Sequence, residues 1–242
     1  MLRQGDRALV LAQRLLEQIT HAPEIEEDMA LANLALDLIG QARALFSYAG
    51  EVEGVGHDED HFAYWRDQRE FLNPLLVEQP NGDFAHVIVR QFLHDSFALP
   101  YWETMTRSSD RTLAALAGKA EKETAYHLRH SRAWVVRLGD GTTESHARAQ
   151  AAMADLWRYT GELFEHDDVE ASLIATGVAA DPSDLAGAWR AAVEGALREA
   201  TLSVPSDVVM QSGGRVGRHS EGFSYLLGEL QVVARAHPGA TW

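Results

Sequence analysis

The sequence of 242 residues contains no cysteine. This absence excludes disulfides, thiolate zinc sites, iron–sulfur ligation by this chain and a cysteine nucleophile. Any metal site would therefore have to be built from histidine and carboxylate side chains. A protein without cysteine also fits a reducing compartment, so we expect a cytoplasmic protein.

Two further scarcities exclude membranes and nucleic acids as expected partners. No segment reaches the roughly 18 apolar residues of a membrane span, and the longest apolar run near the N-terminus, Ala8–Ala12, is too short for a signal peptide. Positive charge is also scarce, because 21 Lys and Arg oppose 36 Asp and Glu, which gives a net charge of −15. Such a charge repels phosphate backbones and anionic lipid surfaces.

What the sequence does contain is helical periodicity in a composition typical of globular proteins, with 46% hydrophobic and 24% charged residues. Apolar residues recur three and four positions apart, as the buried face of a helix requires. The helix from 24 to 48 is apolar on most of its circumference, so we expect it to be surrounded by other helices. The predicted helices cover residues 4–20, 24–48, 83–105, 110–138, 144–165, 183–200 and 221–236, with a short helix over 60–71.

The order of these helices predicts an all-α fold of a particular kind. Two long helical hairpins, over 4–48 and 83–138, are joined by a long connection, which is the pattern of a ferritin-like four-helix bundle. The remaining helices, which are C-terminal, would pack outside those four. We therefore predict one ferritin-like helical domain over residues 1–242.

Ferritin-like bundles hold two metal ions with a Glu-x-x-His motif on each of two helices and a carboxylate on each of the other two. No Glu in this sequence is followed three residues later by His. The nearest patterns, Asp58 with His61 and Asp83 with His86, lie in the connection and at a helix start. The sequence thus speaks against a di-metal site, and no metal ligand is assigned.

Polar residues nevertheless interrupt the apolar stripes where such a site would sit. They form pairs four residues apart on three helices, namely Asn33 with Asp37, Gln91 with Asp95, and Glu123 with His127. Asn and Gln are poor metal ligands, and the Glu-to-His spacing is one residue too long. A buried, hydrogen-bonded polar layer that fixes helix register is the favoured interpretation, and an altered metal site is the alternative.

A glycine-rich segment near the C-terminus, Ser212–His219, is the other candidate site. Its backbone donors and the side chains of Arg215 and Arg218 could bind a phosphate, although it matches neither known glycine-rich phosphate motif. A plain surface or interface loop is the alternative. No nucleophile elbow is present, so no catalytic residue is assigned.

Several segments together resemble a known family. They are Leu31–Arg43 (LANLALDLIGQAR), Leu76–Ala85 (LVEQPNGDFA), Ala125–Arg129 (AYHLR), Leu156–Thr160 (LWRYT) and Gly213–Gly214. In their order and spacing they resemble the family of the C subunit of bacterial phenylacetyl-CoA epoxidase, also called ring-1,2-phenylacetyl-CoA monooxygenase. The resemblance covers nearly the whole chain.

The resemblance implies a ferritin-like, non-catalytic subunit of an oxygenase complex that epoxidises the ring of phenylacetyl-CoA in aerobic phenylacetate degradation. It implies that the chain pairs with and stabilises the catalytic A subunit, which holds the di-iron centre, while a reductase with flavin and an iron–sulfur cluster supplies electrons from NADPH. No cofactor is then expected in this chain, and a second copy of it is a further candidate partner.

On that view the polar positions are remnants of a lost metal site, and Arg215 and Arg218 are candidates for a CoA-phosphate contact. The competing hypothesis is a stand-alone ferritin-like di-metal oxidase or metal-binding protein with an altered ligand set. The remnant positions are Asn33, Asp37, Asp95, Glu123 and His127.

Overall fold

The computed structural model of the chain describes residues 1–240, and these contain helices and no β-strand. The all-α fold class predicted from the sequence is confirmed. The α-helices of this described part are α1 (Leu2–Leu16), α2 (Ile25–Glu53), α3 (Leu75–Glu78), α4 (Phe84–Met105), α5 (Arg111–Gly139), α6 (Thr143–Leu156), α7 (Asp168–Ala175), α8 (Ala186–Glu199) and α9 (Glu221–Ala236).

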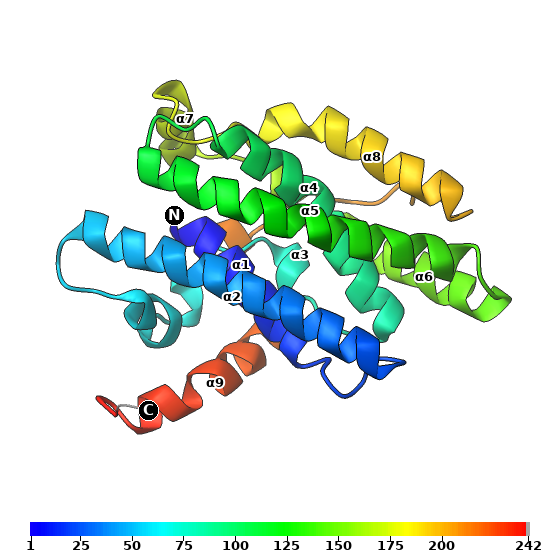
Figure 1. Cartoon of the computed structure of the whole chain (residues 1–242), viewed down its shortest axis with the longest axis horizontal. Coiled ribbons are helices and arrows are strands. Elements are labelled where there is room, and N and C mark those ends of the chain that lie inside the picture. The colour runs from blue at the N-terminus through cyan, green and yellow to red at the C-terminus, as the bar shows by residue number, and fades with distance from the viewer. Residues whose placement is uncertain (241–242) are drawn as a thin grey trace. The chain divides into compact units, whose positions relative to one another are not determined.

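The chain divides into two compact units. The terminal unit contains Met1–Asn81 and the segment that begins at Ser212, and the central unit contains Gly82–Gln211. Each unit holds one of the two predicted long hairpins, α1 with α2 and α4 with α5 (Figure 1). A single domain and a four-helix bundle both require the two hairpins to pack against each other, so these two statements stay predictions.

In the terminal unit, α1 packs along α2, and the short helix α3 packs against α1. The C-terminal helix α9 contacts α1 and a single π-turn at His61–Trp65, which follows the end of α2 (Figure 1). Chain segments from both ends of the sequence therefore build this unit, and side chains from α1, α3 and the segment before α9 can meet in it.

In the central unit, α6 and α8 both pack against the α4–α5 hairpin. The indole Nε1 of Trp189 on α8 donates a hydrogen bond to the carbonyl oxygen of Leu93 on α4, at 3.1 Å. The helix α4 is deeply buried and includes Pro100 within its last turns. Its buried positions include several polar side chains, which form one of the candidate sites.

Local capping signals explain where the hairpin of the central unit begins and turns. Asp83 caps α4 by accepting a hydrogen bond from the backbone N–H of His86 at 3.0 Å. Asp110 caps α5 by accepting from the N–H groups of Thr112 and Leu113 at 2.9 and 3.0 Å. The predicted helices 83–105 and 110–138 begin and end within one residue of the observed α4 and α5, whose starts these caps mark.

Several elements differ from the prediction. The helix over 4–20 ends at Leu16, and the helix over 24–48 continues to Glu53. The helix over 144–165 ends at Leu156, because the Thr160 hydroxyl donates to the Trp157 carbonyl and closes a tight turn. The helix over 60–71 is instead two separate turns, His61–Trp65 and Gln68–Glu70. The helix α7, which Asp167 caps, was not predicted.

The expectation that the second helix is surrounded by others is wrong. On α2, Met29 and Leu36 are each 62% exposed, whereas the residues of α1 from Ala8 to Ala12 are all buried. Apolar composition around a helix therefore did not reveal which of its faces are covered. By length and composition alone α2 could also cross a membrane, but 44% of its most apolar stretch is buried, and core helices of soluble proteins pass the same test.

Candidate functional site

A polar layer crosses the buried core of the central unit, between α4 and α5. Asp95 on α4 is fully buried and accepts hydrogen bonds from side chains of both helices. Its Oδ1 accepts from Gln91 Nε2 at 2.8 Å and from His94 Nδ1 at 3.0 Å, and its Oδ2 accepts from the Ser131 hydroxyl at 3.0 Å. The layer thus ties α4 to α5 through one carboxylate.

The hydrogen bonds of Asp95 show what surrounds its carboxylate. A carboxylate has about four lone-pair sites on its two oxygens, and protein donors already face both oxygens of Asp95. His94 donates through Nδ1, and Gln91 donates through its amide, so these neighbours stabilise the carboxylate as an anion. The donor set around Asp95 therefore fits a structural role, in which one carboxylate holds α4 to α5.

The other predicted remnant positions lie in different surroundings. In the central unit, His127 is buried on α5, and Glu123 forms an ion pair with Lys119 at 3.3 Å. In the terminal unit, Asn33 is exposed and Asp37 is half-buried on α2. Among residues 1–240, no group of three or more His, Asp or Glu side chains is arranged to hold a metal ion.

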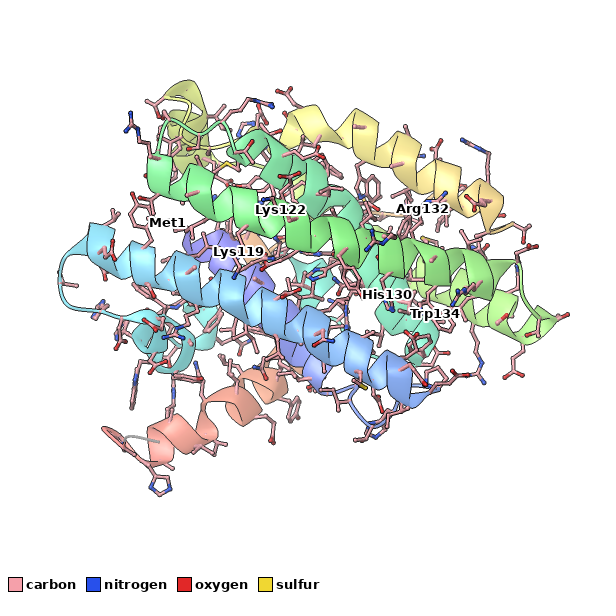
Figure 2. All side chains as sticks on the ribbon, in the orientation of Figure 1. Met1, Lys119, Lys122, His130, Arg132 and Trp134 are labelled. Atoms are coloured by element: carbon pink, nitrogen blue, oxygen red, sulfur yellow. The ribbon has the colours of Figure 1, made fainter. Side chains whose placement is uncertain are left out.

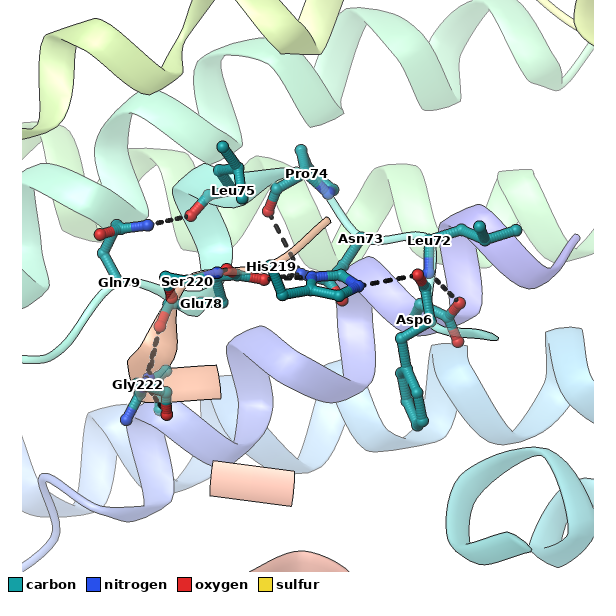
Figure 3. A network of polar contacts seen from close by, with 12 residues as sticks. Asp6, Leu72, Asn73, Pro74, Leu75, Glu78, Gln79, His219, Ser220 and Gly222 are labelled. Carbon is teal, nitrogen blue, oxygen red and sulfur yellow. Dashed lines mark hydrogen bonds and ion pairs between the residues drawn. The ribbon is translucent and has the colours of Figure 1, made fainter. Parts of the chain in front are cut away.

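The terminal unit contains a second buried polar cluster, which the sequence did not predict (Figure 3). His219, in the segment before α9, lies with its Nδ1 2.6 Å from Glu78 Oε2 and its Nε2 2.9 Å from the Phe71 carbonyl oxygen. Both partners are acceptors, so both ring nitrogens must donate. This geometry fits a protonated imidazole, for which His219 and Glu78 form an ion pair whose side chains are fully buried.

Glu78 on α3 is the centre of this cluster. Besides His219, its carboxylate accepts from Asn73 Nδ2 at 2.9 Å and from the backbone N–H of Ser220 at 2.6 Å. Its own carbonyl oxygen accepts from Arg14 Nε and Nη2 at 2.9 and 2.7 Å. We call Glu78, His219, Arg14 and Asn73 the C-terminal clamp, because they join the segment before α9 to α1 and α3.

A neighbouring ion pair joins α1 to the turns that follow α2. Asp6 accepts hydrogen bonds from two nitrogens of Arg66 and from the Leu72 N–H, the last at 2.9 Å. The Arg66 guanidinium also lies over the Phe71 ring, 4.3 Å from its centroid. Asp6 and Arg66 are both buried, so this pair fixes the turn region against α1.

The buried charges of the terminal unit shift two pKa values. Burial alone would lower the pKa of His219, but the hydrogen bond and charge of Glu78, the Phe71 carbonyl and the charge of Asp6 together raise it above its usual range. Burial raises the pKa of Asp6, against the opposing effect of Arg66 and the Leu72 N–H. The polar atoms that carry these charges face one another, which suits a structural cluster.

The glycine-rich segment with Arg215 and Arg218 packs closely on the backbone of residues 69–75, which precede and begin α3. A Cβ on Gly214 would lie 2.2 Å from the Asn73 carbonyl oxygen, and one on Gly217 would lie 2.2 Å from that of Arg69. The backbone N–H groups of residues 216–218 donate to the carbonyls of Gly213 and Gly214. These glycines therefore serve close backbone packing, and these three N–H groups are used within the loop.

The two predicted phosphate contacts differ in exposure, since Arg218 is exposed and Arg215 is half-buried. The terminal unit also has a groove of about 560 Å³ between α9 and the π-turn, lined in part by Asp58, Asp60 and Tyr64. Neither arginine lines this groove. Its carboxylates would repel the phosphates of a CoA group.

The whole chain matches one protein family. A family profile described as "Phenylacetic acid catabolic protein" matches residues 1–242. The chain belongs to this family. Within the phenylacetic acid catabolic proteins it is 48% identical to the C subunit of 1,2-phenylacetyl-CoA epoxidase from Escherichia coli (strain K12), over 241 residues that make up 100% of this chain and 97% of that protein.

The family resemblance predicted from the sequence is thus confirmed over the full length. Glu78 and Asn73 of the C-terminal clamp lie in or near the segment Leu76–Ala85 that carried the resemblance. The signal that could have identified Glu78 is a single carboxylate that follows an apolar run over 75–77. No local signal marks His219, because it meets Glu78 across 141 positions of sequence.

Proposed function

We propose that this chain is a structural, non-catalytic subunit of the oxygenase that epoxidises the ring of phenylacetyl-CoA in aerobic phenylacetate degradation. In this function it pairs with and stabilises the di-iron catalytic A subunit in the cytoplasm. The observation that carries the proposal is the full-length similarity, at 48% identity, to a protein named as the C subunit of such an epoxidase.

The polar layer of the central unit supports the non-catalytic part of the proposal. Both oxygens of Asp95 accept hydrogen bonds from protein donors, and Gln91 supplies an amide where a di-iron site needs a carboxylate. The iron of the complex then belongs to the A subunit, and the flavin, the iron–sulfur cluster and NADPH belong to the reductase. The residues of this layer act by holding α4 and α5 in register.

The test is metal analysis and mass determination on two samples, the chain purified alone and the chain co-expressed with the A subunit. We expect the lone chain to carry far less than one iron or manganese per chain, and the co-expressed sample to be a stable complex that contains iron. Stoichiometric metal in the lone chain, with no partner retained, would support the stand-alone oxidase instead.

A matched variant separates a residual site from adventitious metal. Glu123→Gln with His127→Asn removes the two predicted remnant side chains that could ligate on α5. Metal that binds the lone wild-type chain tightly and is lost in this double variant would contradict the proposal. We expect metal to bind weakly, and equally so, to the wild-type chain and to the double variant.

A further inference from the structure

The helix α5 is positively charged on a chain that is otherwise strongly acidic. Between Arg111 and Gly139 the sequence has six Lys and Arg and two Glu, so this helix has a net charge of +4. The rest of the chain has 15 positive and 34 negative side chains, a net charge of −19. Six of the 21 Lys and Arg side chains, including both lysines, thus lie on this one helix, where they outnumber the acidic side chains.

The positive side chains lie on one side of α5, over an arc of about 140° at ~3.6 residues per turn. Arg111, Lys122 and Arg129 are separated by 11 and 7 residues, which places them within about 20° of one line along the helix at ~3.6 residues per turn. From Arg111 to Arg137 this side of the helix extends about 39 Å at ~1.5 Å per residue. We call it the cationic face; its exposed members are Arg111, Lys119, Lys122, Arg129, Arg132 and Arg137, of which Figure 2 labels Lys119, Lys122 and Arg132.

Most of this charge has no counter-charge in the chain. Lys119 pairs with Glu123, and Arg132 pairs with Glu199 on α8. Within residues 1–240, no carboxylate pairs with the other four cations, although the chain has 36 acidic side chains. Two of the four instead lie over aromatic rings, Arg129 over Tyr126 at 5.2 Å and Arg137 over Trp134 at 5.3 Å.

The residues between the cations show what kind of contact the face could make. Ala115, Ala125 and Ala133 are exposed on it, and the only large exposed hydrophobic side chain on α5 within the described residues is Tyr126. Permanent subunit interfaces bury more apolar surface than these side chains offer, whereas charged surfaces with few apolar side chains are typical of reversible contacts. Nucleic acid and anionic lipid suit the face poorly, because the charge of −19 on the rest of the chain repels them.

We infer that the cationic face of α5 is a docking surface for an acidic patch on another protein of the assembly, in a reversible contact under electrostatic control. This inference rests on the proposed function, because the acidic partner is sought among the other components of the oxygenase. It adds a surface and a partner chemistry that the similarity to the C subunit does not supply.

The test uses the full chain and a charge-reversal variant, Lys122→Glu with Arg129→Glu. Neither side chain has an ion pair to lose, so the fold should be kept, and circular dichroism checks this. The matched control is Arg158→Glu with Arg198→Glu, which makes the same charge change at exposed positions of the central unit outside α5. The binding of each purified component of the oxygenase, the reductase included, is measured at several salt concentrations.

We expect at least one component to bind the wild-type chain more weakly as the salt concentration rises. The same component should bind the α5 variant about tenfold or more weakly than the wild type, and with a smaller dependence on salt. The control variant should change affinity less than about threefold. If the wild-type complex assembles and the α5 variant binds every component as the wild type does, the inference is wrong while the proposed function stands.

Two other outcomes also overturn the inference. If the wild-type chain binds no component at any salt concentration, both the inference and the proposed function fail. If the α5 variant instead changes only the self-association of this chain, measured by sedimentation, the face contacts a second copy and not a separate acidic protein.

Discussion

The C-terminal clamp allows a stability prediction that depends on one buried ion pair. In Glu78→Gln the carboxylate that accepts from His219, Asn73 and the Ser220 N–H becomes an amide. One of its two terminal atoms is then a donor that faces other donors, and the protonated His219 loses its counter-charge inside the protein. Removing one partner of a buried ion pair costs about 3–5 kcal/mol, and we expect a loss of this size.

Glu17→Gln is the matched control for this experiment. Glu17 also pairs with an arginine of the clamp, Arg14, at 2.9 Å, but its side chain is 40% exposed. Water can replace the lost contact, so we expect a loss below about 1 kcal/mol. The two variants make the same chemical change at sites that differ mainly in burial.

Urea unfolding, followed by circular dichroism, measures both effects. A loss of 3–5 kcal/mol corresponds to a midpoint lower by about 1–2.5 M for a urea dependence near 2–3 kcal/mol per molar. If Glu78→Gln unfolds within about 1 kcal/mol of the wild type and of Glu17→Gln, the reasoning from a buried His219–Glu78 ion pair is refuted.

The pH dependence of the same clamp gives an independent check. The folded-state pKa of His219 is raised, so its contribution to stability is complete below the unfolded-state pKa of about 6.5 and is lost as pH rises through the folded-state pKa. The stability difference between the wild type and Glu78→Gln should therefore shrink as pH rises above about 6.5. A difference that stays constant to about pH 9 would show that His219 is not charged in the folded protein.

Three further predictions concern other parts of the chain. Gly214→Ala should destabilise the protein by about 1–3 kcal/mol, because its Cβ would lie 2.2 Å from the Asn73 carbonyl oxygen. A Cβ at Gly228 on α9 meets open space, so Gly228→Ala should stabilise the protein by about 0.5–1 kcal/mol. Thermal unfolding of both variants checks this contrast. Asp95→Asn should lower the free energy of unfolding by about 1 kcal/mol or less, because the Ser131 hydroxyl can turn its proton to the His127 carbonyl at 3.0 Å. Asp95→Ala should lower it by about 2–4 kcal/mol. Equal losses of the two variants in urea unfolding would contradict this account. Burial alone would raise the pKa of Asp83, but hydrogen bonds from His86 lower it. The stability that this cap of α4 contributes should therefore be present above about pH 4 and lost as pH falls through the folded-state pKa of Asp83. Acid titration should show the wild type about 1 kcal/mol more stable than Asp83→Ala above about pH 4, and this difference should disappear at lower pH.

The helices of this chain were predictable because their signals are local. The caps at Asp83 and Asp110 and the regular apolar spacing lie within a few residues of the ends they determine. The short helix α7 was missed because its eight residues contain too few periodic positions to stand out from a loop. The turns at 61–70 were merged into one helix because spacing alone does not reveal where a π-turn interrupts the pattern.

The polar residues show the limit of periodicity. The pattern identified Asp95 as a polar interruption of an apolar stripe, and the structure shows that it accepts hydrogen bonds within the core. The same pattern gave Asn33 equal weight, yet that side chain is exposed, because the apolar stretch of α2 extends onto an uncovered face. Periodicity identifies a face of a helix, and only the packed neighbours decide which face is buried.

The glycine-rich segment shows why one sequence pattern admits two functions. A phosphate and a neighbouring backbone impose the same local requirement, because either one approaches too closely for a Cβ. Gly214 and Gly217 meet that requirement against the Asn73 and Arg69 carbonyls, and the resulting close packing brings His219 to Glu78. The glycines and the buried ion pair therefore depend on each other: a Cβ at Gly214 would displace the segment that carries His219, so Gly214→Ala should also weaken the pH dependence that the clamp confers.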